Sequence, residues 1–167
     1  MLALPGPIGG LQTGCATDGQ RVYTNGIDRL PHLPLQGSYP PPTGGRVTAI
    51  SLDTQKEFWR HERPKIDWIG GTKAKPLFKS CGDPIASGIA LANGLAFCTT
   101  FSSNKLLCLD VETGNLLKEF SIGPVLCGPS ISRGRVYVGS GNTAFSNSPE
   151  EAYFPKKFTG ELLVFGL

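Results

Sequence analysis

Three stretches of the chain repeat one pattern: a short strand of small residues, a turn ending in glycine, and a second strand. The turn glycines are Gly19, Gly94 and Gly134, and Arg-Val-Tyr soon follows the first and the third. The dipeptides Asp18-Gly19 and Asn93-Gly94 favour tight hairpin turns, because glycine adopts positive φ without a Cβ clash. The repeat therefore predicts antiparallel hairpins.

A third apolar strand is expected after each hairpin, at residues 46–52, 105–109 and 161–165. In the first two copies a fourth segment follows, at 56–59 and 116–120. Four antiparallel strands in succession make one propeller blade, and the 40 residues between Gly94 and Gly134 match a blade period. The sequence thus predicts an all-β fold, a partial β-propeller of about three four-stranded antiparallel blades from a ring of seven or eight.

The expected blades are separated and interrupted by longer segments. Blade 1 is expected at about 8–59 with a proline-rich insertion at 28–45, which cannot lie inside a sheet. A long loop is expected at 60–81, blade 2 at about 82–122, and blade 3, incomplete because it lacks an outermost strand, at about 123–167. Long loops on such a scaffold either carry binding functions or are inert decoration, and the sequence leaves both alternatives open.

Composition excludes several classes of protein. The net charge is only +3 and the basic residues are scattered, so no basic face for nucleic acid is expected. No apolar run is long enough to cross a bilayer, and no signal peptide is expected in this chain, because residues 1–5 have no basic segment and too short an apolar run. The five cysteines contain no Cys-x-x-Cys spacing, which argues against c-type haem and zinc fingers. Cys98 and Cys108 flank a turn, so either a disulfide or two packed thiols is consistent with the sequence.

The segments at 49–59 and 108–118 resemble the eleven-residue docking motif of pyrroloquinoline-quinone (PQQ) type quinoprotein propellers, Ala-x-Asp-x-x-Thr-Gly-Lys-x-x-Trp. The first copy keeps Trp59, which we expect to pack between neighbouring blades, but has Gln55 in place of glycine. The second keeps the turn and has Lys118 in place of tryptophan, leaving Phe120 to pack. The opening at 9–19 looks like the start of a blade in polyvinyl-alcohol-dehydrogenase-like quinoproteins.

This resemblance implies a cofactor channel along the axis of the ring. Quinoprotein dehydrogenases of this family hold PQQ and calcium in that channel, so both are candidate cofactors of the full-length protein, and neither is expected in this chain alone. The first strand of each blade lines the channel, which makes the residues before Gly14, Gly88 and Gly128 the candidate cofactor-binding positions: Gln12 or Thr13, Ser87 and Cys127. Asp83 is the nearby carboxylate, suited to bind calcium, to act as a base, or to cap a turn before Pro84.

The resemblance gives two functional hypotheses. The first is a fragment of a PQQ-dependent alcohol or sugar dehydrogenase, inactive by itself because three blades cannot close a ring. The second is a non-catalytic PQQ-repeat scaffold or protein-binding propeller that resembles the outer-membrane assembly lipoproteins. In either case the expected partners are the remaining blades of a parent chain or another subunit, and the parent is expected to be periplasmic or secreted. No catalytic residue can be assigned from the sequence.

Overall fold

A computed structural model describes residues 13–26, 45–64, 66–72, 75–81, 83, 85, 87–101, 103–141 and 160–166. All regular secondary structure within these ranges is β-strand, arranged in antiparallel sheets. The first sheet, blade 1, has the order β1 (Ala16–Thr17), β2 (Arg21–Gly26), β3 (Arg46–Ser51) and β4 (Glu57–Glu62). Each strand pairs with the next along the chain, which is the meander that the repeat predicts.

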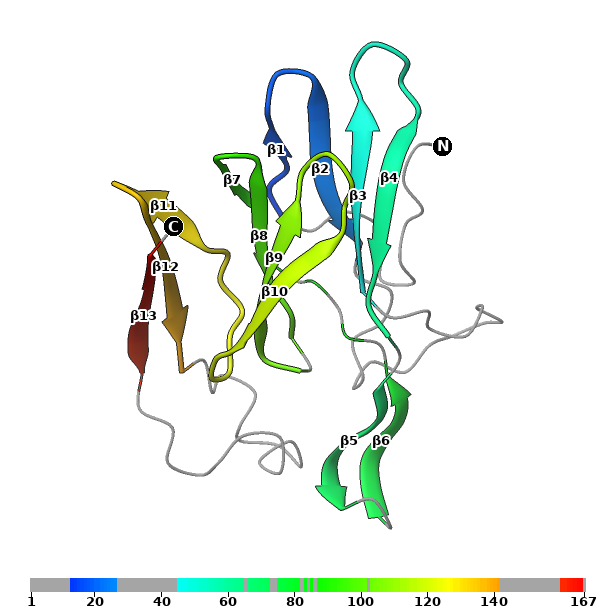
Figure 1. The fold of residues 1–167 in the computed structure, drawn as a ribbon. Coiled ribbons are helices and arrows are strands. Elements are labelled where there is room, and N and C mark those ends of the chain that lie inside the picture. Colours follow the sequence, from blue (N-terminus) through cyan, green and yellow to red (C-terminus); the bar gives the residue numbers. More distant parts are fainter. Residues whose placement is uncertain are drawn as a thin grey trace.

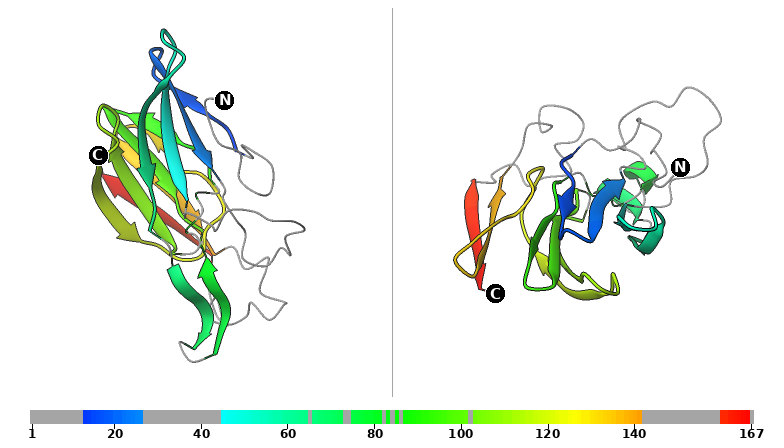
Figure 2. Two further views of the ribbon diagram at one scale, coloured as in Figure 1. Left: turned by 90° about the vertical axis from the view of Figure 1, so that its right-hand side faces the viewer. Right: turned by 90° about the horizontal axis from the view of Figure 1, so that it is seen from above.

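Two further sheets repeat this order. Blade 2 consists of β7 (Ala90–Ala92), β8 (Leu95–Thr99), β9 (Lys105–Asp110) and β10 (Leu116–Ser121). Blade 3 consists, in the described part of the chain, of β11 (Ser130–Ser132), β12 (Arg135–Ser140) and β13 (Glu161–Gly166). The three sheets stand side by side (Figure 1) and fan out when seen from above (Figure 2). The predicted all-β partial propeller is confirmed.

Residues 60–81 differ from the loop predicted there. β4 continues to Glu62, and a hairpin of β5 (Ile66–Thr72) and β6 (Lys75–Cys81) follows, projecting from one end of the blades (Figure 1). The sequence did not predict this hairpin, because it contains Gly70, Gly71 and Pro76, and glycine and proline are depleted in strands. Most of the predicted proline-rich insertion, 28–44, lies outside the described residues.

The hairpin turns have the backbone geometry that their residues predict. Asn93 and Gly94 have φ of 51° and 76°, and Arg133 and Gly134 have φ of 48° and 71°. Two successive positive φ values are the type I′ pattern that matches the twist of paired strands. These turns connect the first two strands of blades 2 and 3.

The hydrophobic core lies between the sheets, not inside one of them. The side chains of β8 and β9 alternate between two clusters: Ala96, Cys98, Leu107 and Leu109 pack toward blade 1, and Phe97, Leu106 and Cys108 pack toward blade 3. Because both faces of the central strands of blade 2 are buried, β8 and β9 are apolar at most positions. Sheets stacked face to face in this way are the construction of a propeller.

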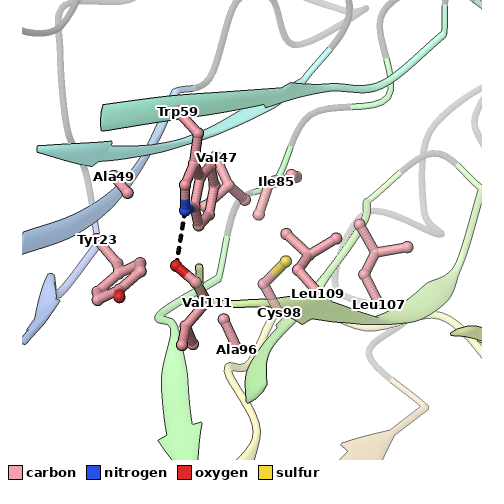
Figure 3. Packing of buried hydrophobic residues seen from close by; sticks show 10 residues of the cluster. All are labelled: Tyr23, Val47, Ala49, Trp59, Ile85, Ala96, Cys98, Leu107, Leu109 and Val111. Atoms are coloured by element: carbon pink, nitrogen blue, oxygen red, sulfur yellow. Dashed lines mark hydrogen bonds between the residues drawn. The ribbon is translucent and has the colours of Figure 1, made fainter. Parts of the chain in front are cut away.

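Trp59 joins blade 1 to blade 2. Its indole Nε1 donates a 2.7 Å hydrogen bond to the carbonyl oxygen of Val111, and its ring lies 5.8 Å from that of Tyr23 (Figure 3). A Cβ added to Gly114 would meet the Trp59 ring at 2.5 Å, so the indole packs directly on this glycine. The predicted position of Trp59 between blades is confirmed.

The turn that receives Trp59 is held by Asp110 and Thr113. Asp110 Oδ1 accepts from the amides of Glu112 and Thr113 at 3.0 and 2.8 Å, and from Thr113 Oγ1 at 2.8 Å. The hydrogen bonds from Thr113 lower the pKa of Asp110. The equivalent turn of blade 1 is looser: Ser51 Oγ accepts from Thr54 N at 3.2 Å, and Gln55 occupies the glycine position with φ of 54°. The Asp-Thr-Gly motif therefore shapes a docking turn.

Between blades 2 and 3 an aromatic pair replaces tryptophan. Phe120 lies 4.8 Å from Phe165, centroid to centroid, with the ring planes tilted by 45°. Phe120 is partly buried against the apolar cluster between blades 2 and 3. It therefore has the packing role that we expected for it, because Lys118 replaces the tryptophan of the motif.

Gly114→Ala should destabilise the protein more than Gly134→Ala. Both glycines have φ near +70°, so each substitution incurs the left-handed penalty of about 1–2 kcal/mol. Only at Gly114 would the new methyl group also collide with Trp59, since nothing lies within 4 Å of a Cβ at Gly134. We expect Gly114→Ala to cost at least about 1 kcal/mol more in urea unfolding. Equal losses would contradict the described packing of Trp59.

Candidate functional site

The predicted inner positions Thr13, Ser87 and Cys127 occupy equivalent places in the three blades. Each binds back to the second strand of its own blade, at the fifth residue of β2, β8 or β12. Thr13 Oγ1 donates to Asn25 Oδ1 at 2.8 Å, and Ser87 Oγ accepts from the Thr99 amide at 2.8 Å. Cys127 Sγ donates to the Gly139 carbonyl at 3.1 Å. Gln12 lies outside the described residues.

The fifth residues of β2 and β8, Asn25 and Thr99, also connect one blade to the next. Asn25 Nδ2 donates to the carbonyl oxygen of Ile85 at 2.7 Å and to that of Ser87. Thr99 Oγ1 donates to the Cys127 carbonyl at 2.9 Å. A Cβ on Gly128 would lie 2.9 Å from the Gly88 carbonyl oxygen, so the inner segments pack backbone to backbone. The segments that precede β1, β7 and β11 are thus joined from blade to blade, with Cys127 exposed and Ser87 buried.

Asp83 is buried in an ion pair between blades 1 and 2. It is 1% exposed, and its Oδ2 accepts from Arg63 Nε at 3.1 Å and from Ser103 Oγ at 2.7 Å. Its Oδ1 accepts from the Ser103 amide at 2.9 Å. Arg63 also reaches Glu119 Oε2 at 3.3 Å. Asp83 therefore ties the segment after β4 to the turn between β8 and β9.

These contacts decide whether Asp83 fits a calcium ion. Both of its oxygens already accept hydrogen bonds, and a guanidinium stands where a second oxygen ligand would be required. In the described part of the chain no group of three His, Cys, Asp or Glu side chains converges to hold a metal. The described residues therefore do not fit a calcium site, and no catalytic step is derived through one.

A second polar network closes the opposite end of the same interface. Arg21, at the start of β2, donates to Glu112 through Nη1 at 2.9 Å and Nη2 at 2.6 Å, and its guanidinium lies 4.3 Å from the centroid of the Phe58 ring. The hydrogen bonds that Arg21 donates to Glu112 raise the pKa of Arg21. Burial and the hydrogen bond to Asp18 raise the pKa of Tyr23 to about 12, so its hydroxyl stays protonated. Two arginines thus hold blades 1 and 2 together, one at each end.

Sequence reasoning missed most of these polar partners. Arg63, Ser103 and Asn25 stand in no motif, and only their proximity in the fold reveals their roles. Arg21 had a signal in the recurring Arg-Val-Tyr, but nothing in the sequence identified Glu112 as its partner. Nothing in the sequence indicated that the Asp83 carboxylate would bind Arg63 and Ser103.

Cys98 and Cys108 do not form a disulfide. Cys98 pairs with Leu107 and Cys108 with Phe97, so a shift of one residue points the two thiols to opposite faces of blade 2. Burial raises the pKa of Cys98 to about 12 and also raises that of Cys108. Of the two alternatives that the sequence left open, the structure has packed thiols.

The stacked sheets and docking turns define the chain as a sector of a β-propeller. No protein-family model matches it, and no curated protein matches it in sequence. Among solved structures, a europium-containing methanol dehydrogenase superposes with a TM-score of 0.54 at 15% identity, over 93% of this chain and 33% of that one. The chain therefore spans about a third of that enzyme's length, and the likeness shows the fold.

Two other solved structures match less closely. The quinohemoprotein alcohol dehydrogenase from Comamonas testosteroni has a TM-score of 0.48 at 16% identity, over 79% of this chain and 17% of that one. BamB from Moraxella catarrhalis has a TM-score of 0.30 at 12% identity, over 77% of this chain and 43% of that one.

Within the described ranges, no helix has the length and apolar character needed to cross a membrane.

Asp83→Asn should cost about 3 kcal/mol of unfolding free energy, because it removes the buried carboxylate that pairs with Arg63 and leaves this guanidinium with the half-exposed Glu119. Glu119→Gln is the matched control, since it removes the other carboxylate of Arg63. Glu119 is 40% exposed, so this loss should stay below about 1 kcal/mol. Chemical denaturation of the three proteins measures both values, and similar losses would contradict the buried pair.

Stability should fall as the pH drops below about 6.5, in part through His61. Burial, and secondly the charge of Arg63, lower the pKa of His61 in the folded chain, and its Nε2 is buried with no hydrogen-bond partner among the described residues. The unfolded chain therefore binds a proton at His61 more tightly than the folded chain does. The stability that His61 contributes is fully present above its pKa in the unfolded chain, and it is lost as the pH falls toward its lower pKa in the folded chain. Denaturation at pH 7.5 and 5.5 should show a smaller decrease for His61→Gln than for the unsubstituted protein; equal decreases would exclude this role.

Thiol reactivity should divide the cysteines into two pairs. In a Cys81→Ser background, Cys15 and Cys127 are exposed and should react quickly with an aromatic disulfide reagent, whereas Cys98 and Cys108 should react only on unfolding. Absorbance at the end point should report two thiols in the native protein and four in denaturant. Only two thiols after unfolding without reductant would indicate a disulfide and contradict the register of β8 and β9.

Proposed function

We propose that the chain is a three-blade sector of a PQQ-dependent dehydrogenase-like propeller, which oxidises an alcohol or sugar hydroxyl when its ring is complete. The observation that carries the proposal is the docking of Trp59 on the Val111 carbonyl and Gly114, at a motif that resembles the quinoprotein repeat. The fold likeness to a methanol dehydrogenase supports the same class of protein. The resemblance of residues 9–19 favours the polyvinyl-alcohol-dehydrogenase-like members.

In this proposal the sector contributes part of the channel wall and the rest of the ring supplies the cofactor site. Gln12, Thr13, Ser87 and Cys127 would lie on the wall, with Cys127 exposed enough to meet a ligand. PQQ, when bound, would accept the two electrons removed from the hydroxyl, with calcium held by blades outside this chain. The parent protein would act in the periplasm or outside the cell.

A non-catalytic scaffold is the second candidate, and one observation favours it. Asp83, the carboxylate nearest the predicted wall, is already bound by Arg63 and Ser103, so its role is structural in this sector. In this second proposal the complete propeller would bind proteins and would transfer no electrons.

The test is oxidation of primary alcohols and sugars by the complete parent protein, reconstituted with PQQ and calcium and followed with an electron-accepting dye. The dehydrogenase proposal predicts dye reduction together with quinone absorbance in the protein fraction. A folded parent that shows neither would contradict the dehydrogenase proposal and favour the scaffold. This chain alone should show no turnover under the same conditions, and turnover by the purified chain would overturn the proposed inactivity of the sector.

A further inference from the structure

The outward face of blade 3 exposes large apolar side chains. On β13, Leu163 and Phe165 pack toward blade 2, while Leu162 and Val164 point the other way and are 67% and 49% exposed. Tyr137 pairs with Val164 from β12, so its side chain stands on the same outward face. We call Arg135, Tyr137, Leu162 and Val164 the blade 3 flank. As in β9, apolar residues occupy consecutive positions of β13, a pattern typical of strands buried on both faces.

The strand register shows what covers the same positions in the other blades. Tyr137 pairs with Val164 as Tyr23 pairs with Ala49 and Phe97 pairs with Cys108. In blade 1 these positions pack against blade 2, and in blade 2 they pack against blade 3. The counterparts of Leu162 are Val47 and Leu106, both fully buried. The blade 3 flank therefore continues a series of two interfaces already present in the chain.

Arg135 adds a charge requirement to the apolar one. It opens Arg-Val-Tyr in β12 as Arg21 does in β2, and Arg21 is 8% exposed because Glu112, on the docking turn of the next blade, binds it through two hydrogen bonds. Arg135 is exposed at the equivalent place. A partner that fits the flank thus carries a carboxylate on its own docking turn.

We infer that the blade 3 flank is the docking surface for a further β-blade, one with an apolar face like that of Val136, Val138, Leu163 and Phe165 and a carboxylate at the place of Glu112. Blade 1 of a second copy does not meet this requirement. Its outward face carries Thr24 and Thr48 where blade 3 has Val138 and Leu163, and both threonines are already buried at 3% and 4% exposure. The inference rests on the propeller architecture of the proposed function and not on its chemistry.

The chain itself supplies the probe. An extended protein is made by joining three segments in order: residues 1–165, then a copy of 110–165, then a copy of 110–121. Each β13 then continues into a copy of the docking turn, as β9 continues into it in blade 2. The added sequence provides a fourth strand for blade 3, and then a fourth blade with its own copy of Glu112. Leu162→Ser and Arg135→Ala are introduced in the original blade 3 of both the natural and the extended protein. Leu117→Ser, also in the original copy, is the control, because Leu117 is 54% exposed on β10.

Thermal unfolding is the readout, and it involves no cofactor, so its failure is distinguishable from failure of the dehydrogenase proposal. In the extended protein Leu162→Ser should lower the melting temperature by roughly 5–10 °C and Arg135→Ala by roughly 3–6 °C. In the natural chain both shifts, and that of the control in either protein, should stay within about 2 °C.

Other results would overturn the inference. Equal shifts in both proteins would show that the added blade does not cover the flank. An extended protein that fails to fold would count against it too, since the strands of the appended segments, β10 to β13, already form in the natural chain. Sedimentation of the natural chain is the second measurement: concentration-dependent association abolished by Leu162→Ser would make a second copy the occupant in place of a further blade, whereas a monomer agrees with the inference.

Discussion

The structure depends on the contact between the indole of Trp59 and the turn of the neighbouring blade. Each blade of this chain has at least one apolar face that it cannot bury alone, and blade 2 has two, so each blade is stable only against another. Trp59 satisfies its one donor on the Val111 carbonyl and places its ring on Gly114, where no side chain competes for the space. The residues of the docking turn are best understood as the means of presenting that carbonyl and that glycine.

The two arginines extend this contact into an interface with fixed alignment. Arg21 bridges to Glu112 at one end and Arg63 to Asp83 at the other, with the apolar cluster between them. Charged hydrogen bonds restrict the relative position of two sheets more strongly than apolar packing does. The interface between blades 2 and 3 relies on a different solution, with Phe120 against Phe165 and the hydroxyl of Thr99 on the Cys127 carbonyl.

Much of the fold was predictable because its signals are local. Asn93-Gly94 fixes a type I′ turn, Asp110 to Gly114 fixes the docking turn, and apolar runs such as 105–109 report strands buried on both faces. The hairpin at 66–81 was not predictable, since glycine and proline within it resemble a loop. Of the candidate site residues, Thr13, Ser87 and Cys127 lie at equivalent positions as the repeat predicts. The contacts of the candidate site residues depend on residues far away in sequence, as the pairing of a further candidate, Asp83, with Arg63 shows.

The measurement that tests this account most directly is the nuclear Overhauser contact between the Trp59 indole and the α-protons of Gly114 in solution, assigned with the help of Trp59→Phe. Blades stacked through Trp59 predict strong contacts from the ring to Gly114 and slow solvent exchange of the indole N–H proton, which is bonded to Val111. Rapid exchange of that proton, with no contact to Gly114 in a folded protein, would contradict the stacking on which the whole account depends.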